Sequence, residues 1–168
     1  MYHTAERMYN IAYYASQWLG IAAFCLYLTS LVLYVPPVTS VSNPKVTLFK
    51  SYRKIDGVQF DMDLDLDFTP SFNWNTKMIF VWVKASFETE KTPMNIATVW
   101  DTMIRKRENA HLVLKNEKIE YTLMDFGKEL KGKTVNLTVE WMTVPWSGST
   151  SIRKGNTTTF VLPEQYIK

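Results

Sequence analysis

The chain has 168 residues, a net charge of +3, 46% hydrophobic residues and 14% aromatic residues. This length accommodates a membrane segment and one domain with a hydrophobic core. The charge is mild and the basic residues form no block, so nothing indicates a nucleic-acid-binding protein. Cys25 is the single cysteine, which excludes a disulfide within the chain.

The segment from Met8 to Pro44 contains no Asp, Glu, Lys or Arg. Its most apolar part, residues 19–33, can lie in lipid as a helix because a helix satisfies its own backbone polar groups. Trp18 and Tyr34 frame it, as expected at the two membrane interfaces, and lie roughly 25 Å apart along a helix. We expect a signal-anchor helix over residues 11–35, between a tail of residues 1–10 and a domain of residues 36–168.

Two other readings of this segment remain open. A cleaved signal peptide has a shorter apolar region and a small-x-small cleavage site, which residues 38–40 supply poorly. A buried helix of a soluble protein is the less favoured alternative, since the run is apolar on all faces and the rest of the chain indicates strands. One helix face collects small residues that would let another membrane helix approach closely: Ser16, Gly20, Ala23 and Ser30.

Two signals disagree about orientation. The basic residues Lys45, Lys50, Arg53 and Lys54 follow the span, and by the positive-inside rule they place the domain in the cytosol. Glycosylation sequons at Asn136 and Asn156 matter only on the lumenal side. Charge and sequons together leave the topology undecided.

The strongest strand signal is the alternation from Phe60 to Phe68, with apolar residues on one face and aspartates on the other. Such a strand packs one face on a core and exposes the other. Calcium binding by Asp61, Asp63, Asp65 and Asp67 is the alternative. One strand cannot surround an ion, because same-face neighbours lie about 6.6 Å apart whereas calcium oxygens converge to about 2.4 Å from the ion. We therefore expect a solvated face and no metal site.

No helical periodicity persists after Pro44. Prolines 36, 37 and 44 indicate an extended connector before the first strand. Further strands are expected over residues 77–87, 96–104, 110–115, 118–124, 135–144 and 157–162, with turns at 72–75, 125–127 and 131–133. Tryptophans 74, 82, 100 and 141 are available for a core. The pattern predicts a mainly β chain: one N-terminal transmembrane helix and a single antiparallel β-sandwich-like domain.

Catalytic and cofactor motifs are weak. His111 is the only histidine beyond the membrane segment, and combining it with Asp101 and one of Ser147, Ser149 or Ser151 would be needed for a hydrolase triad. No nucleophile elbow, zinc ligand set or phosphate-loop spacing accompanies it. Asp125-Phe-Gly127 lacks the other kinase motifs and indicates a turn. We expect no catalytic residue, no cofactor and no small-molecule substrate.

The soluble region resembles subunit 3 of the eukaryotic signal peptidase complex. The resemblance rests on residues 72–77, on Val99-Trp-Asp101 with Ile104, and on the block from Leu112 to Tyr121. It continues through Asp125, Gly127, residues 130–132, Asn136 to Trp141, Val144-Pro145 and the ending at 162–166. The short N-terminal tail and the single span lie in the places that the family predicts, but Arg7 and Asn10 match its start only loosely and the span is unusually rich in tyrosine.

That resemblance implies a non-catalytic, essential-type accessory subunit of the endoplasmic reticulum membrane. The implied topology is single-pass type II, with a lumenal C-terminal domain glycosylated at the position of Asn136; Asn156 has no family counterpart. The implied partners are the catalytic signal peptidase subunit, the other subunits of the complex and membrane lipid, with signal peptide removal as the shared task. A free-standing type II receptor or adhesion domain, or a hydrolase with an unrecognised site, remain alternatives.

Overall fold

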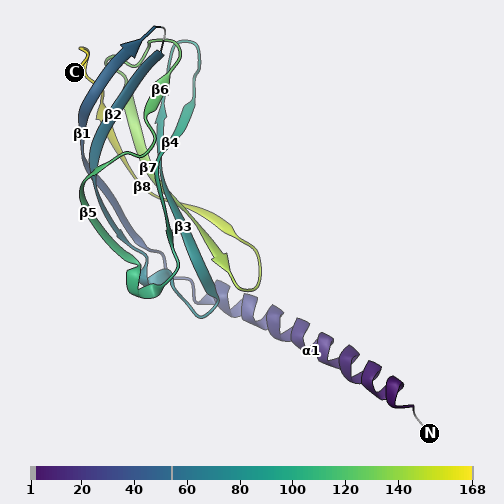
Figure 1. Cartoon of the computed structure of the whole chain (residues 1–168). Coiled ribbons are helices and arrows are strands. Elements are labelled where there is room, and N and C mark those ends of the chain that lie inside the picture. Colours follow the sequence, from purple (N-terminus) through teal and green to yellow (C-terminus); the bar gives the residue numbers. More distant parts are fainter. Residues whose placement is uncertain (1–2, 54, 168) are drawn as a thin grey trace.

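A computed structural model describes residues 3–53 and 55–167. In it, an elongated β-sandwich follows a projecting N-terminal helix (Figure 1). Residues 1, 2, 54 and 168 lie outside the described residues. Lys54 is one of the basic residues that bear on orientation, and the other three belong to the predicted tail and to the end of the predicted domain.

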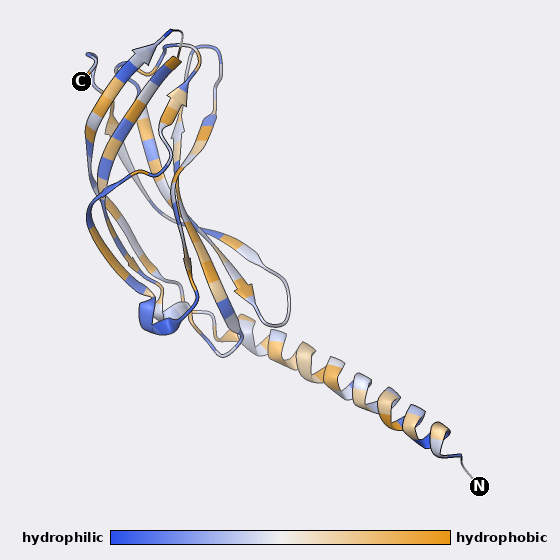
Figure 2. Cartoon of the chain, viewed as in Figure 1, coloured by the Kyte–Doolittle hydropathy of each residue, from blue (hydrophilic) through white to orange (hydrophobic). Residues whose placement is uncertain are grey.

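Helix α1 spans Thr4–Val32, and none of its residues is buried. It begins earlier than the predicted start at residue 11, since nothing in residues 4–10 interrupts a helix. It ends before Pro36, whose ring disfavours helical geometry in the preceding residue. The helix is long and apolar enough to cross a membrane by length and composition. Figure 2 shows it as mainly apolar, with hydrophilic residues near its N-terminal end.

The sandwich consists of two four-stranded antiparallel sheets. The first has the order β1-β2-β5, with β6 also paired to β2, and the second has the order β4-β3-β7-β8. The strands of the first are β1 (Val38–Tyr52), β2 (Ile55–Asp67), β5 (His111–Lys118) and β6 (Leu123–Asp125). Those of the second are β3 (Thr76–Phe87), β4 (Asn95–Ile104), β7 (Thr134–Pro145) and β8 (Ser151–Val161). Short 3₁₀ turns lie at Thr69–Ser71 and Arg107–Asn109.

The core lies between the sheets and follows the predicted alternation. The predicted apolar face is buried throughout: Phe60, Met62, Leu64 and Leu66 of β2, and Phe68 directly after the strand, are at most 1% exposed. Trp100 and Trp141 are also buried, as predicted. Trp74 and Trp82 are not core residues: Trp74 is half exposed in a turn, and Trp82 is half-buried on the outer face of β3.

Strand β1 corrects the expectation of a connector after the helix. Residues 38–52 pair with β2 along almost its whole length. Pro44 is accommodated because the register shifts between Ser42 and Lys45, where Asn43 has a positive φ of 51°. A bulge on an edge strand is where a proline is tolerated, since no ladder hydrogen bond is lost there.

Asp63 links the bulges on both strands that flank β2. Its carboxylate accepts the side-chain amide of Asn43 in β1 at 2.7 Å and the backbone N–H of Asn116 in β5 at 2.8 Å. Asn116 also has a positive φ, and the β2–β5 register shifts between Met62 and Leu64. The aspartate face is thus solvated, and one of its members also fixes the local shape of the sheet.

The two sheets approach closely where β1 meets β8. Thr158 Oγ1 donates to the carbonyl of Val41, which joins the two edge strands directly. Beside this bond, Gly155 of β8 faces Thr39 of β1 and Trp141 of β7, and a Cβ on Gly155 would overlap the Thr39 hydroxyl. The lack of a side chain at residue 155 therefore permits the close approach of the two sheets along this edge.

Candidate interaction site

The outer face of the β4-β3-β7-β8 sheet changes character along the strands. Strict alternation in β3 buries Ile79, Val81 and Val83 and turns the intervening residues outward. Residues near α1 on this outer face are mainly apolar, whereas those at the opposite end are mainly polar: Ser86, Asn136, Thr138, Thr157 and Thr159. This face therefore has a proximal half, which lies near α1, and a distal half.

A carboxylate with three partners separates the two halves. Glu140 is only 6% exposed, accepts the indole N–H of Trp82 at 3.2 Å and forms an ion pair with Lys84. Lys154 Nζ lies 3.6 Å from the same carboxylate. A charge this buried is stable only with such partners. The cluster fixes Trp82 with its ring in the proximal half.

The proximal half carries an apolar surface, which we call the outer-face patch: Phe80, Trp82, Met103, Tyr121, Met142 and Ile152. Phe80 and Trp82 lie with ring centroids 5.5 Å apart. Ile152 is 63% exposed and Met103 is 43% exposed. Phe80, Trp82, Tyr121, Met142 and Ile152 line a shallow depression together with Thr98 and Asp101. Contiguous exposed apolar residues of this kind are typical of a protein interaction site.

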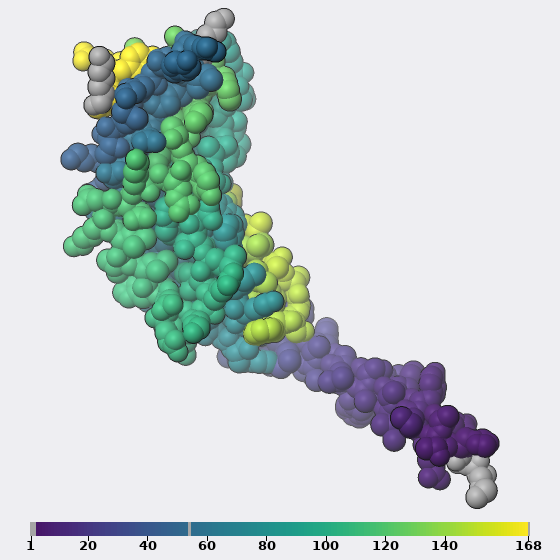
Figure 3. Space-filling model, in the orientation of Figure 1, coloured from purple at the N-terminus to yellow at the C-terminus, as the bar shows by residue number. Residues whose placement is uncertain are grey.

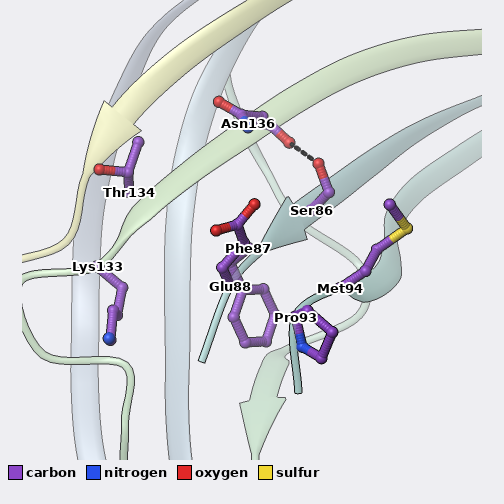
Figure 4. A pocket seen from close by; sticks show the side chains of 8 residues that line it. All are labelled: Ser86, Phe87, Glu88, Pro93, Met94, Lys133, Thr134 and Asn136. Atoms are coloured by element: carbon purple, nitrogen blue, oxygen red, sulfur yellow. Dashed lines mark hydrogen bonds between the residues drawn. The ribbon is translucent and has the colours of Figure 1, made fainter. Parts of the chain in front are cut away.

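The sequon asparagines both lie at exposed positions. Asn136 lies in β7 between the buried residues Val135 and Leu137, so the prediction that its side chain faces solvent is confirmed. Its amide oxygen accepts a hydrogen bond from Thr159 Oγ1 at 2.9 Å. Figure 4 shows its backbone carbonyl accepting a bond from Ser86 Oγ beside a pocket that Met94 and Lys133 also line. Asn156 is exposed on β8.

The predicted helix face divides between two environments. Ser16 is exposed and Gly20 has open space where a side chain would lie. Ala23 and Ser30 are half-buried, because the loop between β7 and β8 and neighbouring residues of the sandwich lie against the C-terminal part of the helix. Ser147 Oγ donates to the Ala23 carbonyl at 3.1 Å, and Ser30 lines a cavity with Tyr27, Tyr34 and Arg153. Only the Ser16 and Gly20 part of the face stays open, and its packing on another helix remains a prediction.

The candidate triad residues are not brought together. His111 begins β5 in the first sheet, and its Nε2 lies 3.2 Å from Asp65 Oδ1. Asp101 pairs with Trp82 in the second sheet, while Ser147 contacts the helix. Among the described residues, no group of three or more His, Cys, Asp or Glu side chains is placed to hold a metal ion.

The sequence analysis did not predict the outer-face patch, although the sequence contains a pattern that indicates it. Residues 78–83 are apolar on both strand faces, and this had indicated only a central strand. In a two-layer sandwich one face of each strand points outward. Apolar residues on both faces of β3 therefore leave Phe80 and Trp82 on the surface.

Fold and surface together define a class: a β-sandwich protein with an adjoining helix apolar enough to cross a membrane, and with an exposed apolar patch near that helix. Its sequence matches the model of a family described as "Signal peptidase subunit" over residues 1–165. The chain belongs to this signal peptidase subunit family, which confirms the resemblance found in the sequence.

Individual relatives agree with this assignment. "Signal peptidase complex subunit 3" of Dictyostelium discoideum is 32% identical over 120 residues, which cover 71% of this chain and 70% of that protein. The protein of the same name in Yarrowia lipolytica is 30% identical, with 56% of this chain and 51% of that protein covered. The one in Homo sapiens is 35% identical, with 54% and 50% covered. The match thus spans about half the length of the last two.

Proposed function

We propose that this chain is a non-catalytic accessory subunit of a signal peptidase complex. It supports the catalytic subunit in removing signal peptides from proteins that enter the endoplasmic reticulum. The observation that carries the proposal is the family match over residues 1–165. Two structural features support it: an anchor helix, and an apolar patch close to that anchor. Essentiality of the subunit is part of the same proposal.

The proposed partner of the outer-face patch is the catalytic subunit. The patch offers aromatic and methionine side chains, which are enriched in the central parts of protein interfaces. It lies in the half of the sheet nearest to α1, so a partner anchored in the same membrane would meet it. A sandwich fixed at one height would hold the catalytic subunit in a set orientation, and orientation alone contributes much to enzymatic rates.

The absence of catalytic residues is likewise proposed. Peptide cleavage requires an activated nucleophile and donors for the developing oxyanion. His111 contacts Asp65 on an exposed sheet face and has no serine or cysteine partner in the described part of the chain. We therefore assign the nucleophile and base to the partner subunit, with no cofactor on this chain.

The proposed topology is single-pass type II in the endoplasmic reticulum membrane. Residues 1–10 would be cytosolic, the span would cover residues 11–35, and residues 36–168 would be lumenal. The sequons at Asn136 and Asn156 support this orientation, and the exposed positions of both asparagines leave them accessible for glycosylation. Unchanged gel mobility after endoglycosidase treatment, or digestion of the domain by protease added outside sealed microsomes, would contradict it.

Paired variants on one strand test the patch. Met103 and Ile96 both lie on β4, face outward and are 43% and 54% exposed, but only Met103 lies in the proximal half. Truncation of a central side chain in an interface costs about 2 kcal/mol or more, which corresponds to about a 30-fold loss of affinity. Met103→Ala should therefore weaken recovery of the catalytic subunit, whereas Ile96→Ala should retain it. Equal recovery with both variants would place the partner elsewhere.

A further inference from the structure

The loop that joins β7 and β8 lies against the side of α1, well before the helix ends. Ser147 Oγ bonds to the Ala23 carbonyl, and Gly148 packs on the Tyr27 ring so closely that a Cβ would overlap it. The helix continues to Val32, about 13 Å further along its axis. Figure 3 shows this loop, in yellow-green, beside the helix where it meets the sandwich. The loop thus reaches back along a helix that is proposed to span the membrane.

Glu6 and Arg7, near the start of α1, limit where the hydrocarbon core of a membrane can lie along the helix. A core of about 27–30 Å requires about 18–20 helical residues. If the core ended before Ala23, it would have to begin near Thr4 and enclose Glu6 and Arg7, which is costly. If it begins at residue 11, the proposed start of the span, it extends to about residues 28–30. The loop contacts α1 at Ala23 and Tyr27, so it reaches the edge of the hydrocarbon.

The composition of the loop between β7 and β8 is consistent with a position at the edge of the hydrocarbon core. No charged residue occurs between Glu140 and Arg153. Trp146 is 70% exposed, and tryptophan is enriched at membrane interfaces. Cations flank the loop: Lys77 Nζ lies 5.3 Å from the centre of the Trp146 ring, and the Arg153 guanidinium lies 3.6 Å from that of Tyr34. Such cations suit the phosphate groups of lipid.

Backbone polar groups of the loop are hydrogen-bonded within the protein, as a low-dielectric environment requires. Asn75 is 1% exposed, and its side chain donates to the Ser147 carbonyl at 2.8 Å and accepts from the Ser147 N–H at 3.0 Å. The carbonyl of Asn75 accepts the N–H of Trp146 at 2.8 Å. Backbone groups near hydrocarbon must be satisfied internally, and a buried amide performs this here.

We propose that the hairpin end, residues 145–151, is a second membrane contact of this chain and lies in the lipid interface beside α1. The proposal rests on the proposed span of α1 and not on the catalytic partner. With helix and hairpin both in the membrane, the sandwich has two attachment points. Its height and its rotation about the helix axis are then fixed, which a single helix and a flexible linker would not achieve.

The test places a fluorescent NBD label on the full-length chain in vesicles of phosphatidylcholine and phosphatidylserine. Thr150 is exposed, so Thr150→Cys in a Cys25→Ser background gives a label site on the hairpin. Lys91→Cys, in the loop between β3 and β4 at the far end of the sandwich, is the matched control. Doxyl-labelled phosphatidylcholine should quench the label at residue 150, and aqueous iodide should quench the label at residue 91.

Two further measurements separate the possible outcomes. A label on the native Cys25 reports on the span itself, and if doxyl lipid leaves it unquenched, both the span and the hairpin contact are wrong. If Cys25 is quenched while residue 150 responds like residue 91, the hairpin contact alone is wrong. A label on Trp146→Cys in the Cys25→Ser background replaces the exposed indole and should also be quenched by doxyl lipid; quenching of that label by iodide and not by doxyl lipid would overturn the proposal.

Discussion

Replacement of Gly155 by alanine should destabilise the sandwich by about 2 kcal/mol, within the usual range for overpacking. The new Cβ would overlap Thr39 Oγ1 and lie 3.1 Å from the Trp141 ring. Thr39 is 5% exposed, so its hydroxyl cannot move into solvent. At about 4 °C per kcal/mol for a domain of this size, the midpoint of thermal unfolding should fall by about 8 °C.

Gly57→Ala provides the matched control in β2. A Cβ there would lie 3.6 Å from Thr122 Cγ2, which is ordinary contact, and the backbone has no positive φ. This variant should be neutral or more stable by up to about 1 kcal/mol, because alanine restricts the unfolded chain. Thermal unfolding of the full-length chain in detergent, followed by circular dichroism, measures both variants.

A second substitution tests the cause of the loss. Thr39→Ala removes the hydroxyl that the Gly155→Ala methyl group would meet, so most of the destabilisation should disappear in the double variant relative to Thr39→Ala alone. An unchanged midpoint for Gly155→Ala, or a loss that Thr39→Ala does not reduce, would refute the account of how the sandwich edge closes.

Three further predictions concern charge, helix packing and catalysis. The Asn116 N–H and the Asn43 amide hold the pKa of Asp63 below its usual value; the stabilisation is complete above the unfolded pKa of about 3.9 and is lost as pH falls through the lower native pKa. Asp63→Asn should therefore lower the urea midpoint at pH 7 and have little effect at pH 2, and an equal effect at both would contradict this. Gly20→Leu meets open space in this chain, so it should weaken co-purification of membrane partners in mild detergent while leaving unfolding unchanged; undiminished recovery would exclude this face. His111→Ala should leave signal-peptide cleavage by the assembled complex within a few fold, whereas a loss of about 100-fold or more would reveal a general base.

Regular patterns in the sequence predicted the fold correctly where burial of apolar side chains alone decides the local structure. The alternation from Phe60 to Phe68 has a single solution, with the apolar face on a core, and β2 adopts it. Turns at 72–75 and 131–133 were also predicted correctly, since Gly132 takes the positive φ that glycine permits.

Long-range contacts account for what the sequence did not predict. Strand β1 is interrupted by a bulge at Asn43 and Pro44, so its periodicity is broken, and only pairing with β2 makes it a strand. Strand β8 begins at Ser151, earlier than the expected residue 157, because β7 supplies a template for a polar sequence. The burial of Glu140 depends on Trp82, Lys84 and Lys154, which come from other parts of the chain.

The central claim is that this chain works as an accessory subunit of a signal peptidase complex. Purification of the native protein from membranes in mild detergent, followed by mass spectrometry of the co-purifying chains, tests it most directly. The account predicts recovery of the catalytic signal peptidase subunit in a comparable amount. Recovery of this chain alone, or with partners unrelated to signal-peptide cleavage, would contradict it.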